Sequence, residues 1–396
     1  MTTYDFDIPV DRFGTDSLKY DRAELFGRSP DLLSLWVADM DFKTPNEVIE
    51  AIVQRANHGI FGYTDPGADY YQAVAAWMRN RHGWEIDPKG ILTTPGVVFA
   101  LAVAVRAYTQ PGDAVLYMPP VYYPFAGVIK ENGRTLAEAP LVFNENSGRY
   151  AIDFEQFERV AVESGAKLLL FCSPHNPVGR VWRREELERL AQICLEHGIT
   201  IVSDEIHEDF IRPGHRHVPT ASLSPEVADI TVTLTSASKT FNLAGLQVAN
   251  AIFSNEKLRR EFATALNVTG YNQANTLGIV ATKAAYEFGA SWLDQLNAYL
   301  EGNWAILADF LDKRIPELKL VEAEGTYLAW VDCRALGLDD KGLKRFILDD
   351  AKLWLDQGDI FGKPGSGFIR INIATQKAYL LRALEQLASA VAARRQ

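Results

Sequence analysis

The sequence predicts an α/β protein with a large domain, ending near residue 285, whose mostly parallel sheet is sandwiched by helices, and a smaller α+β domain. Three observations lead to this prediction. Between about residues 90 and 255, short apolar runs alternate with segments of helical periodicity. Several of these runs are apolar at every position, which is typical of strands buried on both faces. After about residue 314 the chain changes to separate strand-like runs and one terminal helix.

The elements of the large domain follow in order along the chain. Helical periodicity covers 97–108, closed by a Pro-Gly pair, and 184–196, closed by His197 and Gly198. Because strands and helices alternate, the connections must be crossovers between parallel strands. The predicted strands are 114–117, 167–172, 199–202, 230–234 and 248–253.

The rest of the chain has a different pattern of predicted helices and strands. Residues 256–314 are predicted to be mostly helical, and the link between the two domains is expected to be a helix near 285–310 rather than a flexible tract. A final helix is expected from about residue 377. Strands are predicted at 318–321, 326–331 and 368–373.

Composition excludes several classes of partner. A net charge of −11 and the lack of a basic run argue against nucleic-acid binding. The longest apolar run, 97–105, is too short to cross a bilayer, and the N-terminus lacks the apolar region of a signal peptide. The three cysteines are far apart and have no metal-binding spacing, so we expect reduced thiols, no bound metal and a cytoplasmic protein.

The most informative residue is Lys239, which follows the predicted strand 230–234. A lysine removed from solvent loses its proton more easily and can attack an aldehyde. The hydroxyls of Ser236 and Ser238 can hold a phosphate. One small molecule that carries both an aldehyde and a phosphate is pyridoxal 5'-phosphate (PLP). A lone lysine is most often a surface charge, so the prediction depends on the residues that follow.

Two strand ends supply groups for a pyridine ring. Asp204 ends an apolar run and is predicted to keep the ring nitrogen protonated, which makes the ring an electron sink. The alternative is a helix-capping acid, and Asp204 and Glu205 could divide the two roles. Asn176, held between turn-forming prolines, is predicted to donate to the ring's 3'-oxygen, unless it is an ordinary turn residue.

The phosphate and the ring face have candidates at two further strand ends. Gly96, Val97 and Val98 open a helix whose N-terminus favours anions, although a glycine there is also common for structural reasons. Tyr122 is predicted to stack on the ring. The alternative is that it packs within a proline-rich turn.

Two more charged or polar residues are candidates. Arg370 lies in an otherwise apolar run, where an arginine is costly unless paired. It is predicted to bind the substrate carboxylate, with a structural ion pair as the alternative. His207 is counted among the cofactor-binding residues as a hydrogen-bonded histidine near the site entrance, in preference to a metal or acid–base role.

These segments together resemble a known family, the fold-type I PLP-dependent enzymes of the class I/II aminotransferase superfamily. The resemblance is stronger to the PatB/MalY-like cystathionine β-lyase (C–S lyase) subfamily, whose marker is the Trp-Val-Ala-Asp-Met-Asp-Phe segment at 36–42. The matching segments span nearly the whole chain: 36–42, 62–64, 94–98, 119–125, 174–180, 203–207, 236–247 and 370–372.

The resemblance implies further features. The N-terminal segment joins the C-terminal unit, which gives domains at 50–285 and at 1–49 with 286–396. The protein is a homodimer with shared active sites, in which Tyr63 reaches the phosphate of the partner's cofactor. Ala38 and Tyr63 join Asn176 and Arg370 around the substrate. Gln247 stands where aminotransferases often carry a phosphate-binding arginine, and this departure favours a lyase.

The predicted activity is α,β-elimination on cystathionine or a related S-substituted cysteine, giving a thiol, pyruvate and ammonia, with Lys239, Tyr122 and Asp204 as catalytic residues. With cystathionine the thiol is homocysteine, which places the enzyme in methionine biosynthesis. Two alternatives remain open. One is an aminotransferase, and the other is a non-catalytic regulatory binding protein, which the intact set of lysine, aspartate and asparagine disfavours.

Overall fold

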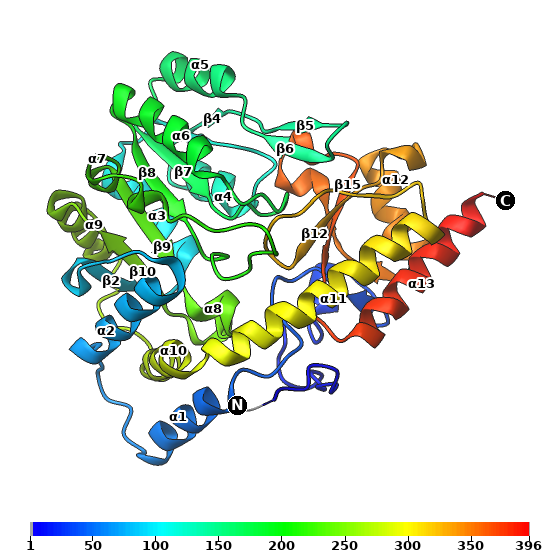
Figure 1. Cartoon of the computed structure of the whole chain (residues 1–396), viewed down its shortest axis with the longest axis horizontal. Coiled ribbons are helices and arrows are strands. Elements are labelled where there is room, and N and C mark those ends of the chain that lie inside the picture. Colours follow the sequence, from blue (N-terminus) through cyan, green and yellow to red (C-terminus); the bar gives the residue numbers. More distant parts are fainter. Residues whose placement is uncertain (1–2, 396) are drawn as a thin grey trace.

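The computed structural model of the chain describes residues 3–395, so Met1, Thr2 and Gln396 of the predicted smaller domain lie outside the described residues. A seven-stranded sheet forms the centre of the large part of the molecule (Figure 1). Its order is β2 (Ile91–Thr94), β10 (Ala249–Phe253), β9 (Thr231–Thr235), β8 (Thr200–Asp204), β7 (Leu168–Cys172), β3 (Ala114–Tyr117) and β4 (Thr135–Glu138).

The predicted mostly parallel α/β sheet is confirmed, with one exception in direction. All pairs from β9 to β4 are parallel, whereas β10 runs antiparallel to both β9 and β2. The chain between β9 and β10 turns back at one edge of the sheet and makes no crossover, and such a connection yields an antiparallel pair. The turning segment is the one that carries Lys239.

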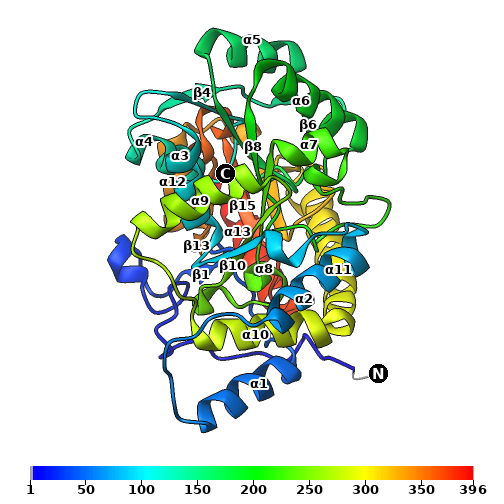
Figure 2. The same ribbon diagram turned by 90° about the vertical axis from the view of Figure 1, so that its left-hand side faces the viewer.

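Helices cover both faces of this sheet because its inner strands are apolar on both sides. Along β7, Leu169 and Phe171 face one core while Leu168 and Leu170 face the other. The first core includes α5 (Phe154–Ser164), α6 (Arg184–His197) and α7 (Pro225–Asp229), and the second includes α3 (Val97–Tyr108), α4 (Pro124–Glu131) and α9 (Glu256–Val268) (Figure 2).

Further helices complete the large part and link it to the small one. α1 (Asn46–Asn57) and α2 (Ala68–Trp77) both contact α10 (Thr276–Phe288). The long α11 (Ala290–Arg314) runs from α10 to the C-terminal sheet and lies beside α13 (Lys377–Arg394) (Figure 1). The predicted linking helix near 285–310 is therefore present as α11.

The C-terminal unit has a four-stranded antiparallel sheet. Its order is β11 (Lys319–Leu320), β12 (Leu328–Asp332), β15 (Phe368–Asn372) and β14 (Asp356–Gln357), and α12 (Asp340–Arg345) lies nearby. The N-terminal segment reaches this unit, because β1 (Leu33–Ser34) pairs in parallel with β13 (Leu353–Trp354). A separate hairpin joins β5 (Val142–Asn144) and β6 (Arg149–Ala151). The domain limits themselves stay a prediction.

The parallel arrangement brings several strand ends to one edge of the large sheet. Tyr117, Cys172, Asp204 and Thr235 each end a parallel strand there. Loops that leave the carboxyl ends of such strands form the usual ligand crevice of open α/β sheets. Among residues 3–395, no helix combines the length and apolarity needed to span a bilayer.

Candidate active site

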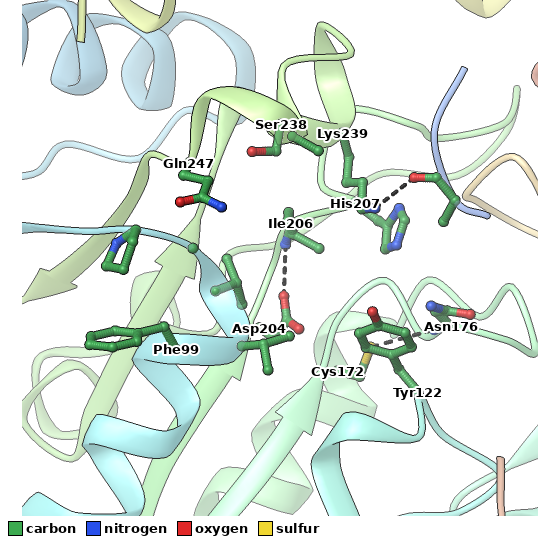
Figure 3. Close-up of a pocket in the computed structure, with 16 residues that line it drawn as sticks. Phe99, Tyr122, Cys172, Asn176, Asp204, Ile206, His207, Ser238, Lys239 and Gln247 are labelled. Atoms are coloured by element: carbon green, nitrogen blue, oxygen red, sulfur yellow. Dashed lines mark hydrogen bonds between the residues drawn. The ribbon is translucent and has the colours of Figure 1, made fainter. Parts of the chain in front are cut away.

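A cavity of about 410 Å³ opens at the carboxyl edge of the large sheet (Figure 3). Its wall is formed by loops that follow β3, β7, β8 and β9, by the start of α3 and by the N-terminal segment. Most of the residues predicted from the sequence line it: Ala38, Gly96, Val97, Val98, Tyr122, Asn176, Asp204, His207, Ser238 and Lys239. Tyr63, Ser236 and Arg370 are not among the lining residues.

Lys239 projects into this cavity from α8 (Ala237–Thr240), a single helical turn that begins directly after β9. Its Nζ atom donates a hydrogen bond to the Ala38 carbonyl over 2.6 Å. Burial lowers the pKa of Lys239 to about 8, and the positive charge of Arg370 acts in the same direction. The carboxylates of Asp39 and Asp204 oppose this shift only in part. A substantial fraction of the amine is therefore neutral near physiological pH.

Asp204 is the last residue of β8 and is buried. Its Oδ1 atom accepts a hydrogen bond from the Ile206 N–H at 3.2 Å, and among the described residues it forms no ion pair within 4 Å. Burial raises the pKa of Asp204 to about 7, and nearby Lys239 lowers it only in part. A buried carboxylate without a cation is costly, so this position fits a ligand that carries a positive charge.

Tyr122 and Asn176 come from neighbouring strand ends and are joined through the backbone. The Tyr122 N–H donates to the Asn176 carbonyl over 3.0 Å. Both side chains lie on the same side of the cavity, with the tyrosine ring turned towards the interior (Figure 3). Burial raises the pKa of the Tyr122 hydroxyl, so this group stays protonated and can donate a hydrogen bond.

The start of α3 forms another part of the wall. Gly96 is the N-cap residue, and no acidic residue occupies the first turn of the helix. Free N–H groups at such a helix start attract an anion. Ser238, from the helical turn α8, also lines the cavity.

The two predicted phosphate-binding serines differ in position. The Ser236 hydroxyl is buried, donates to the Val248 carbonyl over 2.6 Å and accepts from the Ser238 N–H. It therefore caps α8 and ties this turn to the residue that precedes β10. Ser238 is half-buried and lines the cavity, so only the second serine presents itself to a ligand there.

Arg370 is buried in the middle of β15, where it forms the structural ion pair that the sequence left open as its alternative role. Its guanidinium forms an ion pair with Asp356 and donates to Asn176 Oδ1 at 3.0 Å and to the Trp36 carbonyl at 2.8 Å. Within residues 3–395, its Nε atom has no hydrogen-bond partner. Burial raises the pKa of Asp356, and Arg370 opposes this rise. The arginine thus touches the cavity wall through Asn176 and keeps one donor free.

His207 lines the cavity, but its environment differs from the predicted one. The ring is buried, lies 5.9 Å from the ring of Tyr327, and its Nδ1 atom has no hydrogen-bond partner among the described residues. Burial, Lys239 and Arg370 all lower its pKa, so the imidazole is neutral. It is a buried wall residue with an unused polar atom, whereas we expected a hydrogen-bonded histidine at the entrance.

Tyr63 is on the surface of the chain. It is 95% exposed and belongs to a stretch of exposed apolar side chains that includes Ile60 and Phe61. It cannot serve the cavity of its own chain in this arrangement, because it is absent from the lining.

Sequence reasoning missed several residues of the site. Cys172, Phe99 and Ile206 also line the cavity. Cys172 ends the predicted strand 167–172 and Phe99 lies in the first turn of the predicted helix 97–108, so these two positions could have signalled them. Tyr327 donates to the Ala38 carbonyl at 3.1 Å, next to Lys239, and Asp356 pairs with Arg370. The Tyr327 contact joins segments 289 residues apart, and Asp356 faces Arg370 across the neighbouring strands β14 and β15, so no local pattern predicts either contact.

Comparisons with known proteins agree on one family. The family profile described as "Aminotransferase class I and II" matches residues 30–387. Cystathionine beta-lyase PatB of Bacillus subtilis is 44% identical over 387 residues, 98% of this chain and 99% of the relative. Protein MalY of Escherichia coli is 34% identical over 393 residues, with the same two coverages.

A solved structure is also similar to this chain over nearly its whole length. Cystalysin from Treponema denticola, whose crystal structure contains a pyridoxal 5'-phosphate cofactor, superimposes with a TM-score of 0.95 at 39% identity. The match covers 99% of this chain and 100% of that one. The similarity therefore extends over the whole fold, including every segment that forms the cavity.

Proposed function

Because the chain belongs to the class I and II aminotransferase family and is similar to cystathionine beta-lyase PatB over nearly its whole length, we propose that it is a PLP-dependent carbon–sulfur β-lyase. The family resemblance seen in the sequence is thereby confirmed. The reaction is α,β-elimination on cystathionine or a related S-substituted cysteine, and its products are a thiol, pyruvate and ammonia. The observation that carries this proposal is the pair of Lys239 and Asp204 in one cavity.

The residues of the cavity fit PLP. Asp204 is a buried carboxylate that lacks a cationic partner among the described residues, and a protonated pyridine nitrogen would supply that cation. The N–H groups of Gly96, Val97 and Val98 and the Ser238 hydroxyl would hold the phosphate. Lys239 would hold the aldehyde carbon, since its amine is desolvated and has a lowered pKa.

When bound, PLP supplies an electron-withdrawing ring that stabilises negative charge at the substrate Cα. Residues of the chain carry out the proton transfers. The neutral Lys239 Nζ takes the proton from Cα as a general base. The same amine, with the Tyr122 hydroxyl as a partner, delivers a proton to the sulfur that leaves Cβ. Asp204 keeps a proton on the ring nitrogen throughout.

Arg370 and Asn176 would bind the α-carboxylate of the amino-acid substrate. Support comes from the unpartnered Nε of Arg370 and from the hydrogen bond that ties its guanidinium to Asn176 at the cavity wall. A guanidinium binds a carboxylate through two parallel hydrogen bonds, which orients the Cα–H bond for removal. Ala38, whose carbonyl holds Lys239, closes the substrate side.

We also propose a homodimer in which Tyr63 of each chain enters the partner's cavity and contacts the phosphate. The support is the 95% exposure of Tyr63 together with the exposed Ile60 and Phe61 beside it, a surface that a second copy would bury. This role would complete the phosphate site, where Gln247 lines the cavity in place of a cation.

A cytoplasmic location and a role in methionine biosynthesis complete the proposal. The three cysteines are buried and free, as in proteins of reducing compartments. Homocysteine, the thiol released from cystathionine, would be the product that enters methionine synthesis.

A two-product assay tests the activity. Purified enzyme is mixed with cystathionine and no keto acid, and pyruvate and free thiol are measured over time. The lyase assignment predicts that both rise in equal amounts. An aminotransferase would release neither product, because it moves the amino group to an added keto acid and leaves the Cβ–S bond intact. A regulatory binding protein would leave cystathionine unchanged.

A further inference from the structure

A second group of titratable side chains lies buried next to β8 and has no part in the proposed reaction. It consists of three carboxylates that follow this strand and two histidines from other segments, one of them at the end of the helical turn Met78–His82: Glu205, Glu208, Asp209, His82 and His217. All five are buried, and the two imidazole rings lie edge to face with centroids 5.6 Å apart. We propose that this cluster binds one divalent transition-metal cation of the zinc type, with His82, Glu208 and Asp209 as its protein ligands.

The geometry of these three residues suits a small cation. His82 Nε2 lies 3.1 Å from Asp209 Oδ1 and 3.9 Å from Glu208 Oε2. One ligand atom from each residue lies within 4.8 Å of the others. A point equidistant from three such atoms is about 2.0–2.4 Å from each, which is close to the zinc–nitrogen and zinc–oxygen bond lengths of about 2.0–2.2 Å. Imidazole with carboxylates is a common donor set for zinc and its neighbours.

The unpaired carboxylate oxygen of Glu208 is a second, independent indication that a cation binds here. Its side chain is 4% exposed, and Oε2 has no hydrogen-bond partner among the described residues. The 3.9 Å to His82 Nε2 is too long for a hydrogen bond. Ligand atoms of Asp209 and of Glu205 each lie within 4.8 Å of a Glu208 carboxylate oxygen. A cation at this position would satisfy the oxygen and offset the surplus negative charge.

The other two acids already have hydrogen-bond partners, whereas Glu208 has an oxygen without one in the described part of the chain. Glu205 accepts from His217 Nε2 at 2.8 Å, from Ser203 Oγ at 2.7 Å and from the Thr220 N–H at 3.0 Å. Asp209 uses Oδ2 to accept from Thr240 Oγ1 and Trp77 Nε1, which leaves Oδ1 for His82 or a cation. Hydrogen bonds of this kind from surrounding groups orient metal ligands.

The cluster is connected to the active site on two sides. Thr240, bonded to Asp209 at 2.7 Å, is the neighbour of Lys239, and Glu205 is the neighbour of Asp204. A cation held here would therefore brace the turn that carries the lysine against the strand end that carries the aspartate. This is a positioning role, since none of the three ligands lines the cavity.

Zinc-binding measurements on matched variants test the site. Purified holoenzyme is treated with a chelator, incubated with Zn²⁺, freed of excess metal by gel filtration and analysed for zinc per chain. The test variant is Glu208→Gln, which keeps the shape and removes the charge. The control is His197→Gln, in the exposed group of Glu158, Glu196 and His197, whose ligand atoms are similarly close.

We expect one zinc per chain in the wild type and in the control, and at least about tenfold weaker binding in Glu208→Gln. Equal zinc binding by the wild type and Glu208→Gln would overturn the proposal, since the metal would then lie on the surface or on the cofactor. No zinc in the wild type would also overturn it and would leave a proton or a buried water on Glu208.

Anomalous diffraction from zinc-soaked crystals of the wild-type enzyme keeps the test valid if Glu208→Gln does not fold. An anomalous peak among His82, Glu208 and Asp209 is the expected result. Its absence from that position, in crystals that show zinc elsewhere, would contradict the site.

Discussion

The ε-amine of Lys239 and the backbone carbonyl of Ala38, 201 residues apart in the sequence, are joined by a hydrogen bond of 2.6 Å. This contact brings the N-terminal segment over the carboxyl edge of the large sheet. Ala38 O also accepts from the Tyr327 hydroxyl at 3.1 Å, so an N-terminal and a C-terminal segment both reach the central turn that carries the lysine. The contact holds the amine in the cavity, where burial lowers its pKa.

The lowered pKa of Lys239 predicts how cofactor capture depends on pH. The amine is protonated below its pKa of about 8 and neutral above it, and only the neutral form attacks an aldehyde. The rate at which cofactor-free protein takes up PLP should therefore rise with pH and level off above about 8. Stopped-flow absorbance between pH 6 and 10 measures this rate. A midpoint near 10.5, the ordinary value for lysine, would contradict the lowered pKa.

Replacing Asp204 by asparagine should remove the charge that holds a proton on the ring nitrogen. An interaction of roughly 4 kcal/mol between close charges predicts a fall in kcat of about 1000-fold. PLP methylated on the ring nitrogen carries a permanent positive charge, so it should restore part of the activity of Asp204→Asn. Unchanged kcat in this variant, or no rescue by the methylated cofactor, would place the aspartate outside the reaction.

Replacing Asp356 by asparagine should strengthen the binding of the amino-acid substrate. Asp356 pairs with Arg370 and neutralises the guanidinium that we assign to the α-carboxylate. Without this charge, KM should fall about tenfold, equivalent to ~1.4 kcal/mol, while kcat changes little. Steady-state kinetics of both proteins provide the measurement. A rise in KM would mean that the ion pair holds Arg370 in its binding position.

The two serines before the lysine should give different phenotypes. Ser236→Ala removes a buried hydrogen bond to Val248 and should lower the stability of the cofactor-free protein by about 1–2 kcal/mol. Ser238→Ala should leave that stability nearly unchanged and weaken PLP binding. Thermal melts and PLP titrations of both variants separate the roles. If both variants lost PLP affinity to the same extent, the division would be wrong.

Much of the sheet could be predicted because its strands are buried on both faces. The predicted strand 114–117 and helix 97–108 agree with β3 and α3 to the residue, since apolar runs and a closing Pro-Gly pair mark their ends. β4 was missed because it is an edge strand whose residues are mostly exposed and mixed in polarity. β1 and β13 are only two residues long and pair across the chain, so they carry no periodic signal.

The site residues could be predicted where a reactive side chain follows the end of a strand. The prediction failed where contacts between separate segments determine the position of a side chain. Asp204, Asn176 and Lys239 were found because each follows an apolar run and reaches the same cavity. The burial of the Ser236 hydroxyl and the identity of Asp356 as the ion-pair partner of Arg370 could not be predicted, because their partners lie on other strands or turns.

The covalent attachment of PLP at one lysine tests the central claim most directly. Holoenzyme is reduced with borohydride, digested, and its peptides are analysed by mass spectrometry, alongside Lys239→Ala and the surface control Lys283→Ala. We expect the reduced cofactor on Lys239 in the wild type and in the control, and neither label nor turnover above about one thousandth in Lys239→Ala. A label on a different lysine, or full lyase turnover in Lys239→Ala, would contradict the account.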